Sequence, residues 1–283
     1  DAWPPETVPG AGASPESAAG QPPALIRDGL PADTLARLQT ACAAAGVTLS
    51  TAVHAAWGLA LARWSGRADA VFGTVRSGRH LLPGADRTVG CLINTVPLRV
   101  SVGPGLSLGA LLRQVRHTQQ GLRPFEQAAL ADIRRWCDLN ATAELTDATL
   151  LFEPAPLAQR LRDRLGPHRR IELHEQGSAP LSLMAYVDDG LDLRLEYDPQ
   201  RVNATVAPRL LASVARLLAA MADATPATPL AALSALDEGE RVTLARWAAP
   251  DGAPATAPDA EPACELGLME RQARAAPQAP ALR

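Results

Sequence analysis

The sequence predicts an α+β fold, a two-layer sandwich in which helices cover one mixed β-sheet. Three observations support this prediction. Apolar residues recur at helical spacing in some segments and alternate with polar residues in others. Along the chain, these segments follow the order strand, two helices, two strands, two helices, four strands and helix. With 283 residues, 47% of them hydrophobic, the chain is also long enough to bury a substantial core.

The first two expected helices each end at a glycine. Residues 33–45 place their apolar side chains on one helical face, and Gly46 follows them. Glycine there can adopt the left-handed backbone that ends many helices. Ser50 is a suitable N-cap for the next helix, and Gly66 is expected to end it.

The middle of the chain is expected to contain two strands and two more helices. Strands are predicted at residues 70–75 and 94–102. Pro97 restricts the second strand to an edge or bulged position, because proline has no N–H to donate to a neighbouring strand. Ser107 begins the next predicted helix, and a short helix follows at residues 128–136.

Four further strands and a long helix complete the predicted fold. Asp189 and Gly190 favour a tight hairpin turn between the last two strands. The last of these strands alternates apolar and polar side chains, which predicts one buried and one solvent-facing side of the sheet. The expected strands are residues 148–152, 170–174, 181–187 and 191–197, and the helix is about 204–222.

Changes in composition divide the chain into regions. Residues 1–23 are rich in Pro, Gly, Ala and Ser and are expected to form a flexible lead-in. A globular body is expected at residues 24–235 and a linker at 236–262, much of it rich in Pro and Ala. Residues 263–283 contain one short helical pattern. Because the chain begins at Asp1 rather than Met, we expect it to be part of a longer protein.

Charge and cysteine content argue against several kinds of partner. The net charge of −3 gives no basis for binding nucleic acid or an anionic membrane surface. No apolar run is long enough to span a bilayer, so a cytoplasmic protein is expected. The four cysteines lie far apart without a CxxC pattern. Free thiols are therefore expected rather than a zinc site or disulfides, and no metal site is predicted.

The histidines form no recognisable catalytic pattern. None belongs to an HExxH motif, and no serine lies in a GxSxG motif. His54 and His117 are expected on the polar faces of helices. The residues taken alone therefore show no complete active site. The five histidines are His54, His80, His117, His168 and His174.

Four segments, in this order and spacing, resemble the condensation domains of nonribosomal peptide synthetases. Residues 89–99, VGCLINTVPLR, resemble the motif written IGxFxNTxPLR. The other three are DAVFGTVRSGR (69–79), LRPFEQAALADIRRW (122–136) and SAPLSLMAYVDDGLDLRLEYD (178–198). In addition, residues 266–283 resemble the first helix of an adenylation domain.

The resemblance implies a chloramphenicol acetyltransferase-like fold and a role in amide bond formation. Such domains have two lobes, and the N-terminal lobe carries the HHxxxDG motif whose second His acts on the attacking amine. No HHxxxDG occurs in this sequence. The chain is therefore expected to be the C-terminal lobe, inactive alone, with no directly bound cofactor. Its implied partners are the missing N-terminal lobe, upstream and downstream carrier proteins with phosphopantetheine arms as substrates, and an adjoining adenylation domain.

The resemblance assigns roles to four residues. Arg99 matches the arginine that pairs with the Asp of HHxxxDG, so its partner is expected in the missing lobe unless another carboxylate of this chain substitutes. The alternative is an arginine exposed to solvent at the end of a strand. Asn94, Gln127 and Ser178 are expected near the substrate tunnel, although Asn94 could instead only cap its strand.

Departures from the family pattern leave two other functions open. The family's SRNPL motif reads Ser178-Ala179-Pro180-Leu181 here, and Phe125-Glu126-Gln127 stands where the family often has His. These changes mark either a subtype or a non-catalytic relative. The alternatives are an epimerisation domain of the same fold, and an interface module that recruits carrier or tailoring proteins.

Overall fold

The computed structural model describes residues 22–79, 83–139, 145–154 and 179–248, together with positions 164, 166 and 274. The chain divides into two compact units, Asp1–Leu236 and Asp237–Arg283. The first unit contains the sheet and the helices that cover it.

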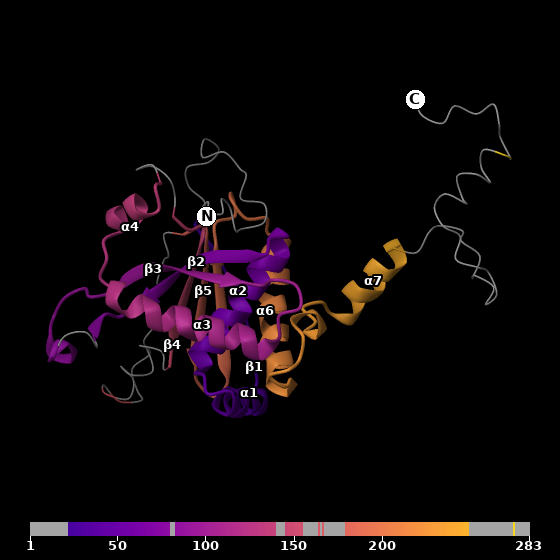
Figure 1. Ribbon diagram of the computed structural model, residues 1–283, viewed down its shortest axis with the longest axis horizontal. Coiled ribbons are helices and arrows are strands. Elements are labelled where there is room, and N and C mark those ends of the chain that lie inside the picture. The colour runs from indigo at the N-terminus through magenta and orange to yellow at the C-terminus, as the bar shows by residue number, and fades with distance from the viewer. Residues whose placement is uncertain are drawn as a thin grey trace. The chain divides into compact units, whose positions relative to one another are not determined.

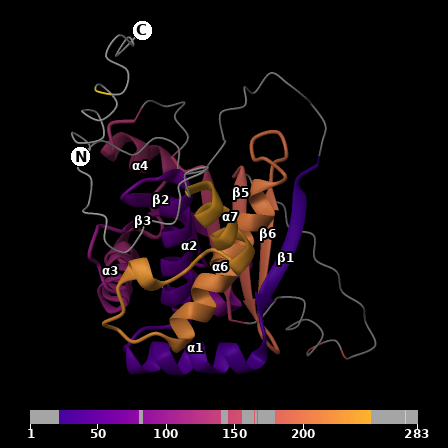
Figure 2. The same ribbon diagram turned by 90° about the vertical axis from the view of Figure 1, so that its right-hand side faces the viewer.

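In the described part, six strands form one mixed sheet with the order β1-β6-β5-β4-β2-β3. β4 runs parallel to β2 and β5, and every other neighbouring pair is antiparallel. β1 and β3 are therefore the two edges (Figure 2). The predicted strand at 170–174 lies outside the described residues. The strands are β1 (Ala24–Leu30), β2 (Asp69–Arg76), β3 (Asn94–Ser101), β4 (Ala148–Glu153), β5 (Leu181–Val187) and β6 (Leu191–Tyr197).

Helices pack on one face of the sheet and share a large hydrophobic core with it (Figure 1), while Ile133 of α4 packs in a smaller cluster with Val96 and Leu145. This arrangement confirms the predicted α+β fold. The helices of this unit are α1 (Ala32–Ala44), α2 (Leu49–Ser65), α3 (Leu108–Leu122), α4 (Leu130–Trp136) and α6 (Val206–Asp223), with short 3₁₀ turns at Ala85–Arg87, Arg123–Phe125 and Leu230–Ala232.

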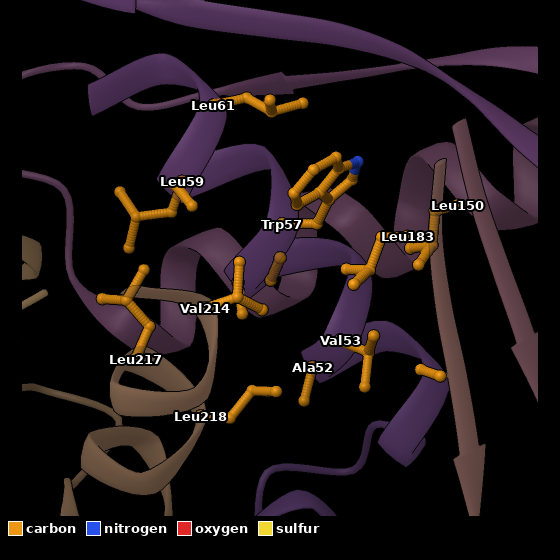
Figure 3. Close-up of a cluster of buried hydrophobic side chains, with 14 of the residues drawn as sticks. Ala52, Val53, Trp57, Leu59, Leu61, Leu150, Leu183, Val214, Leu217 and Leu218 are labelled. Atoms are coloured by element: carbon orange, nitrogen blue, oxygen red, sulfur yellow. The ribbon is translucent and has the colours of Figure 1, made fainter. Parts of the chain in front are cut away.

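α2 is the central element of this core. Each of its residues from Thr51 to Ala62 is buried, so it is covered on all sides rather than along one stripe. Figure 3 shows Trp57 of α2 near Leu150 and Leu183 of the sheet. Gly58 allows the close approach of α2 to β3, because a Cβ there would lie 2.6 Å from the Val100 side chain.

Helix ends follow the predicted residues with one correction. Gly46 and Gly66 have φ of +67° and +68°, and the Ser107 hydroxyl accepts a hydrogen bond from Ala110 N, as expected. The prediction that Ser50 caps α2 was wrong. Thr48, which has the extended backbone of an N-cap, accepts a hydrogen bond from Thr51 N at 3.2 Å, and Ser50 is already helical.

The predicted solvent-facing side of β6 also needs correction. Leu191, Leu193 and Leu195 are buried in the helix-covered core as expected. On the opposite face, however, Glu196 is also buried, and Arg194 lies 4.7 Å from the centre of the Tyr186 ring. The sequence alternation predicts which residues share a face, but it does not predict how far neighbouring side chains cover that face.

Proline has the expected place in β3. Pro97 lies in this strand, which pairs only with β2 among the described strands. An edge strand tolerates the missing N–H. Among the helices of the described residues, none alone is both long and apolar enough to cross a membrane.

Two arginines hold the last segment of the first unit. Arg63 of α2 donates to the carbonyl oxygens of Leu230 (2.5 Å) and Leu233 (2.6 Å). Arg216 of α6 donates to the carbonyl oxygen of Ala235 at 2.8 Å. This segment is therefore fixed almost to the end of the unit.

The second unit begins with a helix that the sequence reasoning did not predict. α7 (Glu238–Ala248) lies in the region expected to be a linker. Asp237 Oδ1 accepts a hydrogen bond from Glu240 N, and Glu240 Oε2 accepts one from Asp237 N. This reciprocal capping box was readable in the sequence as Asp-x-x-Glu.

Candidate functional site

Two residues expected near the substrate tunnel lie in one hydrogen-bond network where β2 ends and β3 begins. The Asn94 side-chain amide donates to the carbonyl oxygens of Glu126 and Ala128, both at 2.9 Å. Gln127 Nε2 donates to the carbonyl oxygen of Leu92 at 3.4 Å. The structure therefore joins two segments that are more than thirty residues apart in the sequence.

An ion pair reinforces this network. Arg76, the last residue of β2, lies opposite Asn94 in the β2–β3 register. Its Nε donates to Glu126 Oε1 at 2.7 Å. The Glu126 side chain is 0% exposed. A buried carboxylate needs such a partner, because an unpaired buried charge costs several kcal/mol.

Gly78 completes the network through its lack of a side chain. Its φ is +64°, a conformation that side chains disfavour. A Cβ at this position would lie 2.1 Å from Gln127 Nε2 and 2.6 Å from the Leu92 carbonyl oxygen. We call the interlocked residues Arg76, Gly78, Asn94, Glu126 and Gln127 the polar lock.

His54 in α2, which contacts Thr74 of β2, corrects a third prediction. It was expected on a polar helix face, but it is buried. Its Nδ1 is 2.7 Å from the carbonyl oxygen of Ser50, and its Nε2 is 2.8 Å from Thr74 Oγ1. Because a carbonyl only accepts, we assign the proton of the neutral ring to Nδ1 and let Nε2 accept from Thr74.

The pKa of His54 is lowered to about 4, chiefly by burial, with the Ser50 carbonyl opposing this shift and the positive charge of Arg76 adding to it. Both ring nitrogens are occupied, so the ring is a structural part of this end of the sheet. His117 is exposed, as expected. The other three histidines lie outside the described residues.

Arg99 lies at the other end of the β2–β3 ladder. Its Nε donates to Asp69 Oδ2 at 2.9 Å, and its Nη2 also contacts that oxygen. Asp69 is thus a carboxylate of this same chain in the position where a partner from a missing lobe was expected. The Arg99 side chain remains 48% exposed. Ser178, the fourth predicted site residue, lies outside the described residues.

Sequence reasoning missed the roles of Arg76, Glu126 and Arg79. Arg79 donates to the carbonyl oxygens of Ala85 (2.6 Å), Thr88 (3.0 Å) and Gly90 (3.1 Å), and so shapes the loop before β3. The arginines at 76 and 79 were visible in the segment 69–79. Nothing in the sequence, however, links Arg76 to a carboxylate fifty residues later.

At this end the described residues include a free thiol, that of the exposed Cys91 in the segment before β3. They contain no cluster of three or more His, Cys, Asp or Glu suited to a metal ion. Burial raises the pKa of the Cys42 thiol to about 11, so that thiol stays protonated at neutral pH. The polar lock can therefore fix backbone and side-chain positions, but its own groups do not form a proton-transfer set.

Comparison with known proteins decides the family. The family model for the condensation domain matches residues 25–245. This chain belongs to the condensation-domain family. One relative of this condensation-domain chain is a linear gramicidin synthase protein of Brevibacillus parabrevis, 33% identical over 212 residues that cover 74% of this chain and 3% of that protein.

Other curated relatives are also much longer than this condensation-domain chain. Chondramide synthase of Chondromyces crocatus is 40% identical over 138 residues, covering 48% of this chain and 4% of that protein. Surfactin synthase subunit 3 of Bacillus subtilis is 29% identical over 241 residues, covering 83% of this chain and 18% of that protein. The chain thus spans a small part of each synthase.

Solved structures share the fold. The first condensation domain of the calcium-dependent antibiotic synthetase matches with a TM-score of 0.63 and 22% identity, covering 82% of this chain and 51% of that one. The X-domain from teicoplanin biosynthesis matches with a TM-score of 0.64 and 17% identity, covering 83% and 52%. This condensation-domain chain therefore spans about half the length of these solved domains.

Proposed function

We propose that this chain is the C-terminal half of a condensation domain in a nonribosomal peptide synthetase. The complete domain joins an acyl thioester and an aminoacyl thioester, both held on carrier-protein phosphopantetheine arms. The amine nitrogen attacks the thioester carbonyl carbon, a C–N bond forms, the C–S bond breaks, and the thiol leaves with a proton. The family match over residues 25–245 is the observation that carries this proposal.

In this proposal, the chain positions substrates and the other half supplies the base. The sequence contains no HHxxxDG, and both nitrogens of His54 are engaged. The polar lock forms one border of the substrate tunnel, with Asn94 and Gln127 holding the 126–128 turn against the start of β3. Ser178 contributes to the same tunnel.

Arg99 keeps its proposed pairing with the Asp of HHxxxDG as an additional contact. Its guanidinium presents several N–H donors, and its half-exposed side chain leaves room for a second carboxylate beside Asp69. The further proposed partners are upstream and downstream carrier domains and an adenylation domain that begins within residues 263–283. We infer a cytoplasmic location for the whole synthetase.

The experiment compares amide formation by the parent synthetase and by variants at two glutamines. Gln127→Ala removes the hydrogen bond to Leu92, so we expect the single-turnover rate of amide formation from two loaded carriers to fall about tenfold. Gln120→Ala, on the exposed surface of α3, is the matched control and should leave the rate unchanged. No amide product from the wild-type parent would refute the proposal, whereas racemised product would indicate an epimerisation domain.

A further inference from the structure

α3 buries one side in the core, and its exposed side carries positive charge. With 3.6 residues per turn, the positions three, four and ten residues after Arg113 lie on nearly the same side of the helix as Arg113 itself. Each of these positions holds an exposed basic residue, and together they span about 15 Å along the helix. We call this set the basic strip, and its members are Arg113, Arg116, His117 and Arg123.

No acidic side chain balances the basic strip locally. The sequence contains no Asp or Glu between Asp86 and Glu126. α3 packs against α2 and β3 (Figure 1), and its first amides donate to carbonyl oxygens of residues 226–228. None of these neighbouring segments contains an acidic residue either. The positive potential of the strip is therefore not cancelled by nearby carboxylates.

The arginines of the basic strip also lack the pairing seen elsewhere in the chain. Several other arginines are held by carboxylates, as Arg99 is by Asp69. Among the described residues, neither Arg113 nor Arg123 has a carboxylate partner. Arg116 donates to a backbone carbonyl, which leaves its charge uncompensated. An anionic partner can therefore contact the strip without first breaking an ion pair.

We propose that the basic strip is a docking surface for a carrier domain, which it contacts through acidic side chains of that domain. This inference rests on the proposed function, in which loaded carriers deliver both substrates. The strip is too long for one small anion and fits a protein surface with several carboxylates. Arg123 lies three residues before Glu126 of the polar lock. A carrier on the strip therefore has its arm, which bears a phosphate, beside the proposed border of the tunnel.

A carrier domain fits this surface better than a permanent partner does. Carriers bind and leave in each cycle, and transient interfaces are smaller and more polar than permanent ones. Exposed charge also stays hydrated between encounters, and complementary charge speeds association. A permanently packed half of the domain would instead cover a more apolar surface. The carrier is therefore the occupant, and the other half is the alternative that the experiment distinguishes.

The experiment uses the full-length parent synthetase, with its own carriers left without phosphopantetheine arms. Loaded upstream and downstream carrier domains are supplied as separate proteins, and the concentration of each is varied in turn. For Arg113→Glu and for Arg123→Glu, we expect the KM for one carrier to rise at least fivefold, because like charges then face each other. The kcat should change less than twofold. The strip holds one domain at a time, so the KM for the second carrier should stay unchanged.

Matched variants separate charge at this place from charge in general. Arg209→Glu, at an exposed position of α6, reverses the same charge on another helix and should change either KM less than twofold. Arg113→Lys keeps the charge and should retain the wild-type KM. Because salt screens exposed charges, the wild-type KM should rise with ionic strength, and this dependence should be weaker in Arg123→Glu.

Four results would overturn the inference. They are wild-type KM values in both strip variants, an equal rise in Arg209→Glu, equal rises for both carriers, and a fall in kcat at unchanged KM. The last result would mean that the strip holds the other half of the domain. If amide forms while KM is unchanged, the proposed function stands and only the docking surface is wrong. No amide from the wild-type parent would refute both.

Discussion

Two arginine–carboxylate pairs lie at opposite ends of the β2–β3 ladder. They have the same chemistry but differ in how far they are buried. Arg76 and Glu126 meet in a buried site, where the Glu126 side chain is 0% exposed. Arg99 and Asp69 meet on the open face, where the Arg99 side chain is 48% exposed. Burial, rather than contact distance, decides how much a pair contributes to stability. Water screens the charges of the exposed pair, whereas it cannot solvate a charge left unpaired in the buried site.

Breaking the buried pair should have the largest effect. Glu126→Ala leaves the Arg76 guanidinium beside a cavity without its carboxylate, so we expect the free energy of unfolding to fall by about 3–5 kcal/mol. Denaturant unfolding of the purified chain measures this. A loss below about 1 kcal/mol would show that the pair is as well solvated as the exposed one.

Acid should weaken the same end of the sheet. The pKa of His54 is about 4 in the folded chain and about 6.5 when unfolded, so the unfolded state binds more protons between these values. Stability is therefore unaffected by His54 above pH 6.5 and falls as the pH drops toward 4, by about 1.4 kcal/mol per pH unit.

Substitution of His54 isolates this contribution from the carboxylates. The difference in unfolding free energy between wild type and His54→Gln should shrink as the pH falls from about 6.5 to about 4.5. His117→Gln, at an exposed position, should show no such change. Parallel pH profiles for wild type and His54→Gln would contradict the assigned burial of a neutral ring.

Gly78 tests the packing of the lock. Gly78→Ala places a Cβ against Gln127 and Leu92 at a positive φ, so we expect a loss of about 1–3 kcal/mol. Gly84 has a φ of +78°, but a Cβ added there would meet nothing within 4 Å, so Gly84→Ala should cost only about 1 kcal/mol. Equal losses at both positions would mean that the backbone angle, rather than the lock, accounts for the effect.

Breaking the exposed pair should have the smallest effect. Arg99→Ala should lower the stability of this chain by about 0–1 kcal/mol, as for other solvent-exposed pairs. If Arg99 also contacts the other half of the domain, the same substitution should cost clearly more in the assembled domain. Thermal unfolding of the chain alone and of the assembled domain compares the two, and equal small losses would remove the proposed second contact.

Most elements of the fold could be predicted from local sequence. Glycines marked the ends of α1 and α2, alternation identified β6, and Pro97 indicated an edge strand. These features depend on backbone conformation and on which side chains share a face, both of which are set by nearby residues.

The rest depended on distant residues. His54 and Glu196 were expected to face solvent because each is polar, yet packing from other elements buries both. Asn94 and Gln127 were identified by resemblance, and the structure brings them together. The pairing of Arg76 with Glu126 spans fifty residues, and a single sequence carries no signal for such a contact.

The most direct test of the account is reconstitution of amide formation from two halves. This chain and the HHxxxDG-bearing half of its parent would be purified separately and mixed with an acyl-loaded and an aminoacyl-loaded carrier. We predict amide product, detected by mass spectrometry, only when both halves are present. Product from this chain alone, or none from the mixture while the intact parent is active, would contradict the account.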